Sequence, residues 1–306
     1  MSHEGEIVSS ELACTVVIPT YNRSALLRHT LDSLTRQHLP TDQFEVIVVD
    51  DGSTDDTADL AASYRDRLDL RYHYQPDEGF RAAAARNIGI ADARSPICVF
   101  ADSGVMLHAD NLNQHVTSHQ SHPGPTAVLA YIYGCTDTGA YSKLIGERLD
   151  VDDLDGSIER MQAQRECRDV RELFYDRYGE DLSRIPAPWQ IFWTGNVSAE
   201  THQLRAVGGF DEQFRTWGGE DLDLGYRLHR DGAHFIFNRQ AKAVHIPHER
   251  VLEAVIEDGE RSHRYMAEKY RTPVIDLLAE LPMERYFDFN ELVAELLTQP
   301  APSGRS

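Results

Sequence analysis

The chain has 306 residues, 41% of them hydrophobic, and carries 50 acidic against 30 basic residues, which gives a formal net charge of −20. This length supports a buried core without disulfides or metals, and the charge argues against nucleic acid or an anionic membrane as the main partner, because both bind basic surfaces. The polar start, the lack of a membrane-length apolar run and four scattered cysteines predict a cytoplasmic protein, with attachment to a membrane surface as the alternative.

Strands and helices alternate over the first hundred residues. Four short apolar runs have the character of buried strands: 13–19, 44–50, 70–75 and 96–102. Helical spacing or capping residues predict three intervening helices: 24–37, a helix opening after 51, and 81–93. This alternation implies right-handed crossovers and a parallel sheet covered by helices.

The rest of the chain is less regular. Further strands are predicted at 126–134, 234–238 and 241–246. Helices are predicted within the charged stretch 150–183, from near Glu220, and in two amphipathic stretches at 251–271 and 288–298. These last two could dock on the body, dimerise or touch a membrane, and the acidic charge favours docking or a homodimer.

The first polar motif, VIPTYNRS at 17–24, stands where the first predicted strand ends and a helix begins. In an open parallel sheet, ligands bind at the carboxyl ends of strands, and a helix start offers free backbone N–H groups to an anion. A purely structural turn is the alternative. The motif lacks the GxGxxG fingerprint, which argues against a dinucleotide-dependent dehydrogenase.

The second motif, VVDDGSTD at 48–55, puts two carboxylates at the end of the next strand. We expect one acid to cap the following helix through an Asx turn and the other to point to the ligand. A carboxylate here suits a base N–H or a ribose hydroxyl, because an acceptor-only group needs donors.

The third motif, DEGFRAAAARNIGI at 77–90, carries Arg81 and Arg86 on one helix. Five residues apart, they point about 140° from each other. Each guanidinium could bind a phosphate group in a ligand cleft or form a surface salt bridge.

Three more polar motifs follow: FADSG at 100–104, WGGEDLD at 217–223 and VHIPH at 244–248. The helix dipole stabilises acids in a first helical turn, which explains Glu220 and Asp221 but not Trp217 with its two glycines. His245 and His248 could bind one metal only if the chain turns at the proline between them.

In this order, PTYNR, VDDGSTD, ARNIGI, FADSG, WGGEDLD and VH resemble the family 2 glycosyltransferases, over roughly 15–248. WGGED is similar to the acceptor-side motif of galactosyltransferase-like and chondroitin-synthase-like members. The resemblance implies an α/β protein of the GT-A fold, with a Rossmann-like mixed sheet flanked by helices and a C-terminal helical extension. We therefore expect a nucleotide-sugar-binding half (1–125), an acceptor and catalytic half (126–250) and a helical extension (251–306).

The resemblance also implies an activity and residue roles. The protein would be a hexosyltransferase that moves a sugar from a nucleotide-diphosphate donor, with UDP as the expected nucleotide, to an acceptor hydroxyl with inversion. Donor binding is implied for Pro19, Thr20, Tyr21, Arg23, Asp51, Arg81, Arg86, Asp102 and Ser103. Asp221 would be the catalytic base, with acceptor contacts from Trp193, Trp217, Glu220 and Asp223. Asp102 and His245, with His248 as a further candidate, would hold Mn²⁺ or Mg²⁺.

Gly104 departs from the family, because it stands where the second acid of the DxD motif is usual. Asp102 and His245 could hold the cation with extra water, arginines could replace it in part, or the protein could bind a nucleotide sugar without turnover. Retaining polypeptide-GalNAc transferases have a similar strand end and a WGGEN motif, but Asp221 favours inversion because it supplies a base. The acceptor stays open between a glycan, a lipid-linked sugar and a small natural product.

Overall fold

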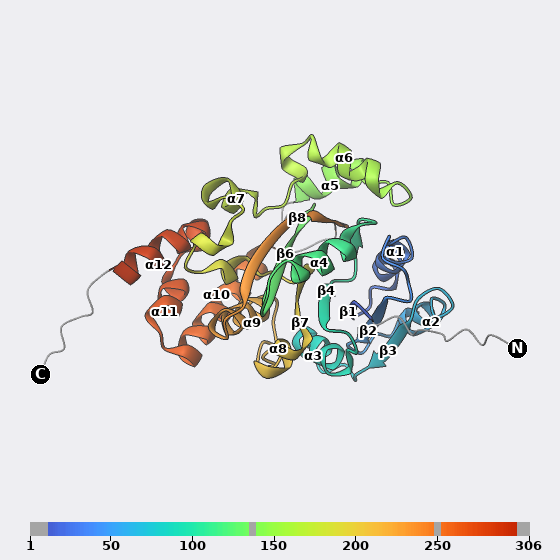
Figure 1. Ribbon diagram of the computed structural model, residues 1–306, viewed down its shortest axis with the longest axis horizontal. Helices are drawn as coiled ribbons and strands as arrows, with labels where there is room; N and C mark the ends of the chain where they lie inside the picture. The colour runs from blue at the N-terminus through green and yellow to red at the C-terminus, as the bar shows by residue number, and fades with distance from the viewer. Residues whose placement is uncertain (1–11, 135–138, 248–251, 299–306) are drawn as a thin grey trace, which may run out of the picture.

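The computed structural model describes residues 12–134, 139–247 and 252–298. In these ranges eight strands form one sheet with helices on both faces (Figure 1). The strands are β1 (Cys14–Thr20), β2 (Phe44–Asp50), β3 (Leu70–Tyr74), β4 (Ile97–Ala101), β5 (Val105–Leu107), β6 (Thr126–Tyr133), β7 (Asn196–Glu200) and β8 (His234–His245). The strands predicted in the first hundred residues are confirmed. The two strands predicted at 234–238 and 241–246 are one strand, β8, and neither β5 nor β7 was expected.

The strand order is β3-β2-β1-β4-β7-β6-β8-β5. The first four strands are parallel, as predicted, whereas β7 runs antiparallel to both β4 and β6. β6 is parallel to β8, and β5 closes the edge antiparallel to β8. The carboxyl ends of β1, β2, β3, β4, β6 and β8 therefore meet at one edge of the sheet, together with the start of β7. We call this the ligand edge.

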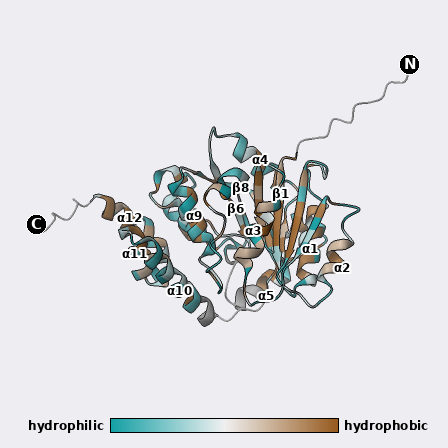
Figure 2. Ribbon diagram, turned by 90° about the horizontal axis from the view of Figure 1, so that it is seen from below, coloured by the Kyte–Doolittle hydropathy of each residue, from teal (hydrophilic) through white to brown (hydrophobic). Residues whose placement is uncertain are grey.

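The strands of the parallel half are apolar throughout because helices cover both of their faces. All seven residues of β2 are buried. Side chains alternate between the two faces along β1: Val16 and Ile18 pack in the cluster that includes the α1 side chains, and Val17 packs in the cluster on the other face. Figure 2 shows these hydrophobic strands between their helices.

The helices connect and cover the strands. They are α1 (Ser24–Leu34), α2 (Thr57–Ala62), α3 (Ala82–Asp92), α4 (Asn111–Gln120), α5 (Gly139–Arg148), α6 (Leu154–Gln162), α7 (Glu172–Tyr178), α8 (Thr201–Ala206), α9 (Glu220–Arg230), α10 (Leu252–Tyr270), α11 (Pro273–Glu280) and α12 (Phe289–Thr298). The first predicted helix ends three residues earlier than expected, and α4, α5, α8 and α11 are additional. Short 3₁₀ turns separate several of them, including η3 (Pro188–Ile191) before β7.

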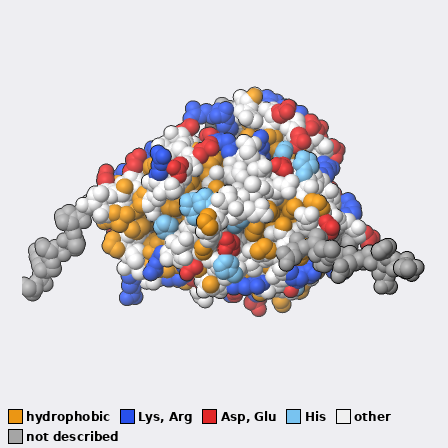
Figure 3. Space-filling view, in the orientation of Figure 1, with side chains coloured by type: hydrophobic (Ala, Val, Ile, Leu, Met, Phe, Trp, Pro, Cys, Tyr) orange, Lys and Arg blue, Asp and Glu red, His pale blue; other side chains and the backbone are white. Residues whose placement is uncertain are grey.

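The C-terminal helices α10, α11 and α12 dock on the body of the protein, which confirms one of the three expected alternatives (Figure 1, orange to red). Their buried side chains belong to the same core cluster as residues of β6, β7 and α9: Met266, Ile275, Leu278, Phe289 and Val293. Figure 3 shows hydrophobic side chains on the side where α11 and α12 lie, and Leu297 of α12 is 65% exposed. Among the helices of the described ranges, none has the length and apolar character needed to cross a bilayer.

Candidate functional site

Asp51 lies at the ligand edge, directly after β2, and its carboxylate is held on both oxygens. Gln75 Nε2 donates to Oδ1 at 2.6 Å, and the backbone N–H of Arg81 donates to Oδ2 at 2.8 Å. Burial raises the pKa of Asp51, and these two hydrogen bonds offset the rise only in part. Asp50, the neighbouring acid, accepts from the backbone N–H of Ser53 at 2.7 Å. Neither acid caps α2: Asp50 bonds within the turn, and the N-cap residue of α2, Asp56, makes no side-chain cap hydrogen bond. The expected helix cap is therefore wrong, and a contact of Asp51 with a ligand stays a prediction.

The turn after β1 lies beside Asp51 and is tied to its neighbours. The Tyr21 hydroxyl donates to Asp77 Oδ2 at 2.9 Å, although its ring is 45% exposed. Ser103 Oγ donates to the Pro19 carbonyl at 3.0 Å, which joins the ends of β4 and β1. Thr20 is buried, and its hydroxyl has no hydrogen-bond partner among the described residues. The predicted donor residues of β1 and β4 thus share one corner, to which Arg23 also belongs by its place in the chain.

Arg81 and Arg86 have different surroundings. Arg81 is the N-cap residue of α3, and its guanidinium bonds Gln75 Oε1 at 3.1 Å and Glu78 Oε2 at 2.8 Å. The side chain therefore holds the loop after β3. Gln75 was not among the predicted residues, although its place at the end of a third parallel strand is a signal for it.

Arg86 is only 4% exposed and bridges two carboxylates. Its guanidinium donates to Asp102 Oδ1 at 2.9 Å and to Glu220 Oε1 at 2.8 Å. Burial lowers the pKa of Arg86, but the two carboxylates outweigh burial and raise it above the ordinary value. The alternative of a surface salt bridge is wrong for Arg86, because the bridge is buried and joins the end of β4 to the start of α9.

Asp102 and Gly104 lie in the turn between β4 and β5, next to His245, the last residue of β8. Val105 pairs with His245, and the backbone N–H of Ile246 donates to the Gly104 carbonyl at 2.8 Å. Gly104 has φ +98°, a conformation that residues with a side chain rarely adopt, although a Cβ there would meet Leu26 only at an ordinary 3.5 Å. The backbone of this turn therefore favours glycine at the position where the DxD motif has its second acid.

The Asp102 side chain is 38% exposed, whereas His245 is half-buried. Within 12–134, 139–247 and 252–298, no three Asp, Glu, His or Cys side chains are grouped as metal ligands. His248 falls outside the described residues. A cation held by Asp102 and His245 therefore stays a prediction.

Asp221 lies in the first turn of α9, beside the start of β7. Its Oδ2 accepts from the backbone N–H of Thr194 at 3.2 Å, and its Oδ1 accepts from the N–H of Leu222 at 2.8 Å. Burial and the Glu220 carboxylate raise the pKa of Asp221 to about 7, against the opposing charge of Arg86. Such a carboxylate can take up a proton near neutral pH. Thr194 was missed because a backbone donor leaves no signal in the sequence.

The other residues of the WGGED motif and Trp193 have unequal access to solvent. Trp217 is 39% exposed, and Trp193 is half-buried with its Nε1 donating to the Gln190 carbonyl at 3.1 Å. Glu220 Oε2 is buried without a hydrogen-bond partner in the described part of the chain. Asp223 is fully buried and bonds Arg227, Lys269 and Tyr270, which indicates a structural role for this predicted acceptor residue.

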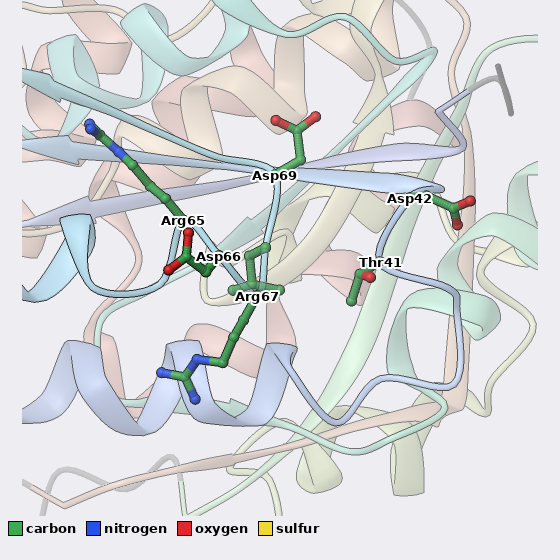
Figure 4. Close-up of a pocket in the computed structure, with 7 residues that line it drawn as sticks. Thr41, Asp42, Arg65, Asp66, Arg67 and Asp69 are labelled. Carbon is green, nitrogen blue, oxygen red and sulfur yellow. The ribbon is translucent and has the colours of Figure 1, made fainter. Parts of the chain in front are cut away.

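A surface depression of about 420 Å³ lies away from the ligand edge (Figure 4). Thr41 and Asp42 line one side of it, and the loop 65–69 lines the other. These segments precede β2 and β3, so the depression is at the opposite end of the strands. None of the predicted site residues lines it, and its wall mixes arginines with aspartates, so we assign it no ligand.

Solved structures with a similar fold carry nucleotide sugars. The Staphylococcus aureus TarS 1–349 structure in complex with UDP-GlcNAc matches with a TM-score of 0.62 and 17% identity, over 94% of this chain and 76% of that chain. The mannosyltransferase PcManGT from Pyrobaculum calidifontis, in complex with GDP-Man and Mn²⁺, matches with a TM-score of 0.59 and 19% identity, over 96% and 78%. At this identity the likeness shows the fold, which is GT-A as predicted.

Several proteins have a higher sequence identity to this chain than these solved structures do. Validoxylamine A glucosyltransferase of Streptomyces hygroscopicus subsp. jinggangensis (strain 5008) is 40% identical over 242 residues, which cover 78% of this chain and 57% of the relative. Hyaluronan synthase of Pasteurella multocida is 30% identical over 243 residues, which cover 72% and 23%. The chain thus spans between 53% and 57% of the length of the validoxylamine enzymes that it matches.

Two protein-family models match the chain, and together they include most of the predicted site residues. Residues 178–249 match the model described as the N-terminal domain of galactosyltransferase, which includes the WGGED motif. Residues 15–171 match the model described as glycosyl transferase family 2. Because this second match takes in more than half of the 306 residues, the protein belongs to glycosyl transferase family 2.

Proposed function

We propose that the protein transfers a hexosyl group from a UDP-linked sugar to an acceptor hydroxyl, with inversion at the anomeric carbon. The observation that carries the proposal is the continuous arrangement Asp102–Arg86–Glu220, which leads to the neighbouring Asp221. It joins the proposed donor half (1–125) to the proposed acceptor half (126–250). Relatives named as a glucosyltransferase and a glycosaminoglycan synthase support this class of reaction.

In the proposed reaction, Asp221 removes the proton from the acceptor hydroxyl as its oxygen attacks the anomeric carbon. A new bond forms from the acceptor oxygen to that carbon, while the bond to the diphosphate oxygen breaks and the nucleoside diphosphate leaves. A base works best when its pKa lies near the working pH, and a pKa of about 7 meets this condition. The N–H of Thr194 orients the carboxylate by holding Oδ2.

Asp51 is the proposed contact to the nucleotide. Its carboxylate is fixed by Gln75 and Arg81 and accepts hydrogen bonds only, so it suits an N–H of the base or a ribose hydroxyl. Tyr21 stands beside it with a half-exposed ring that can pack on the nucleotide. Pro19, Thr20, Arg23 and Ser103 complete the proposed donor surface.

The charges at the ligand edge suit a divalent cation. Asp102, Glu220 and Asp221 place three carboxylates around one guanidinium, and the donor diphosphate would add further negative charge. Mn²⁺ bound by Asp102 and His245 would supply charge to the leaving diphosphate, and it accepts both oxygen and imidazole ligands. The Mn²⁺ in the PcManGT structure supports this part of the proposal.

The proposed acceptor is a small polyhydroxylated ring compound. Validoxylamine A is the first to test, because two relatives that are 40% identical to this chain are named as its glucosyltransferases. Trp217 offers an exposed aromatic ring in the same motif as Asp221, and Glu220 Oε2 can accept a hydrogen bond from an acceptor hydroxyl. A growing glycan is the second candidate, since hyaluronan and chondroitin synthases are also relatives.

Asp221→Asn tests the proposal. With UDP-glucose, Mn²⁺ and validoxylamine A, we expect transfer to fall at least about 100-fold, because the general base is lost, while UDP binding is unchanged. Asp276→Asn is the matched control, since Asp276 also lies in a first helical turn but on the exposed surface of α11. Undiminished transfer by Asp221→Asn would refute the role of this residue.

The same assay separates an enzyme from a binding protein. If the unaltered protein binds UDP-sugars but neither transfers nor hydrolyses them, with Mn²⁺, Mg²⁺ or a chelator, the proposed activity is wrong. Gly104 is the reason for testing binding without turnover, because it stands where the second carboxylate of the DxD motif is usual.

A further inference from the structure

α10 contacts the turn that carries the proposed base, although both family matches end before this helix begins. The galactosyltransferase match ends at residue 249, and α10 starts at Leu252. Ser262 of α10 is 4% exposed, and its Oγ donates to the Gly218 carbonyl at 2.7 Å. We call residues 217–221 the catalytic turn. One hydrogen bond from α10 is therefore made to a residue of the catalytic turn.

The catalytic turn is built to let α10 approach. Gly219 is the N-cap residue of α9 and has φ +96°. A Cβ at this position would lie 2.4 Å from Ser262 Cβ, which is far too close, and 3.0 Å from the Phe214 ring, which is tight. The glycine thus serves two needs at once, the left-handed backbone and the contact with α10.

A second set of contacts holds the next part of α9. Lys269 Nζ donates to Asp223 Oδ1 at 2.6 Å and to Asp211 Oδ2 at 2.7 Å. The Tyr270 hydroxyl donates to the same Asp223 oxygen at 2.6 Å. Asp223 is fully buried, so its charge depends on these partners and on Arg227. α10 therefore bonds α9 at Asp223 and the catalytic turn at Gly218, on either side of Asp221.

We infer that α10 positions the base: Ser262 holds the catalytic turn, and Lys269 and Tyr270 hold α9 just after it, so that Asp221 meets the Thr194 N–H and the acceptor. This inference rests on the proposed function of Asp221. The three side chains act through α9 and are positioning residues. Their hydrogen bonds go to the catalytic turn, to α9 and to the loop before it, whereas the donor surface is built on β1, β2 and β4. A displaced base therefore lowers the rate of transfer, while Asp51, the proposed nucleotide contact, stays held by Gln75 and Arg81.

Ser262→Ala tests the inference, with Ser118→Ala as the matched control. Ser118 is also buried and also donates to a backbone carbonyl, that of Gln114 at 2.8 Å, but it lies on α4, where its Oγ also accepts from Asn238 Nδ2 at 2.9 Å. For Ser262→Ala we expect faster amide hydrogen exchange in 217–222 and a kcat for transfer reduced about tenfold, with UDP affinity unchanged. Ser118→Ala should leave all three measurements unchanged.

Tyr270→Phe is a second variant, because it removes only the hydroxyl that reaches Asp223. Like Ser262→Ala, it should make amide hydrogen exchange faster, here in α9, and lower the kcat for transfer. Unchanged exchange in 217–222 in both variants would overturn the contact, and faster exchange with an unchanged kcat would overturn the positioning role. If the unaltered protein transfers no sugar, the proposed function fails and the positioning role fails with it, while the exchange data still decide whether α10 holds the turn.

Discussion

Asp221 combines surroundings that act on its charge in opposite directions. Burial and Glu220 favour the neutral acid, whereas Arg86 and the N–H groups of Leu222 and Thr194 favour the carboxylate. The balance leaves a pKa of about 7, far above the ordinary value of 3.8. The sequence placed this acid at a helix start, where the dipole by itself lowers a pKa. The rise comes from residues that only the fold brings together.

The pH dependence of transfer follows from this pKa. Because the base must be ionised, kcat/KM should rise with pH through about 7 and level off above it. The folded protein also binds the proton more tightly than the unfolded chain, so Asp221 costs stability as pH rises from about 4 to 7. Asp221→Asn should therefore raise the Tm at pH 8 while it lowers transfer at least about 100-fold. A flat rate profile between about pH 5.5 and 9 would contradict this role.

At the scale of structural elements, Gly104 lies in the turn between β4 and β5. Its carbonyl accepts from Ile246 and its N–H donates to Thr30 Oγ1 at 2.9 Å, so the turn is bonded on both sides. The sequence did not predict β5 or β7, because neither has the apolar run of a typical buried strand. β5 is three residues long, and β7 carries Asn196 and Ser198 at fully buried positions. Short or polar strands form only because neighbouring strands and helices supply their partners.

Gly104→Asp would restore the DxD pattern but force a side chain into the left-handed region. We expect the free energy of unfolding to fall by about 1–2 kcal/mol. Gly146→Ala is the control: Gly146 lies in α5, where a Cβ meets nothing within 4 Å, and this change should stabilise by about 0.5–1 kcal/mol. Urea unfolding measures both. A Gly104→Asp variant as stable as the unaltered protein would show that the turn does not require glycine.

At the scale of the whole molecule, a buried polar network joins α4 to the middle of the sheet. His119 Nε2 bonds Ser198 Oγ at 2.8 Å, and His115 bonds Ser198 through Nδ1 and Asn196 through Nε2. Asn196 Nδ2 donates to the Tyr131 and Ala241 carbonyls, so its Oδ1 must accept from His115. Burial lowers the pKa of both histidines, which are therefore neutral in the fold at pH 7. The face of the molecule drawn in Figure 3, in contrast, mixes acidic and basic side chains.

This network predicts acid sensitivity. Burial lowers the pKa of His115 to about 4 and that of His119 to about 3, from 6.5. Because the unfolded chain takes up these protons first, stability should fall as pH drops from about 6.5 to 4. Asp221 acts in the opposite direction, so the test compares two proteins: His115→Gln should lose about 1–2 kcal/mol less than the unaltered protein between about pH 7 and 5. Equal losses in urea unfolding would contradict the assignment.

The sequence by itself determined the family, the parallel half of the sheet and the acids at its strand ends. These features are local: an apolar run, a glycine turn and a capping acid act within a few residues, so their order along the chain is enough to identify them. The tertiary structure decided which partners those acids have. Arg86 meets Glu220, 134 residues away, and Ser262 meets Gly218 across 44 residues. Contacts of this range exist only when β4, β7, β6 and β8 lie in the observed order, because that order brings α3, α9 and α10 to one edge.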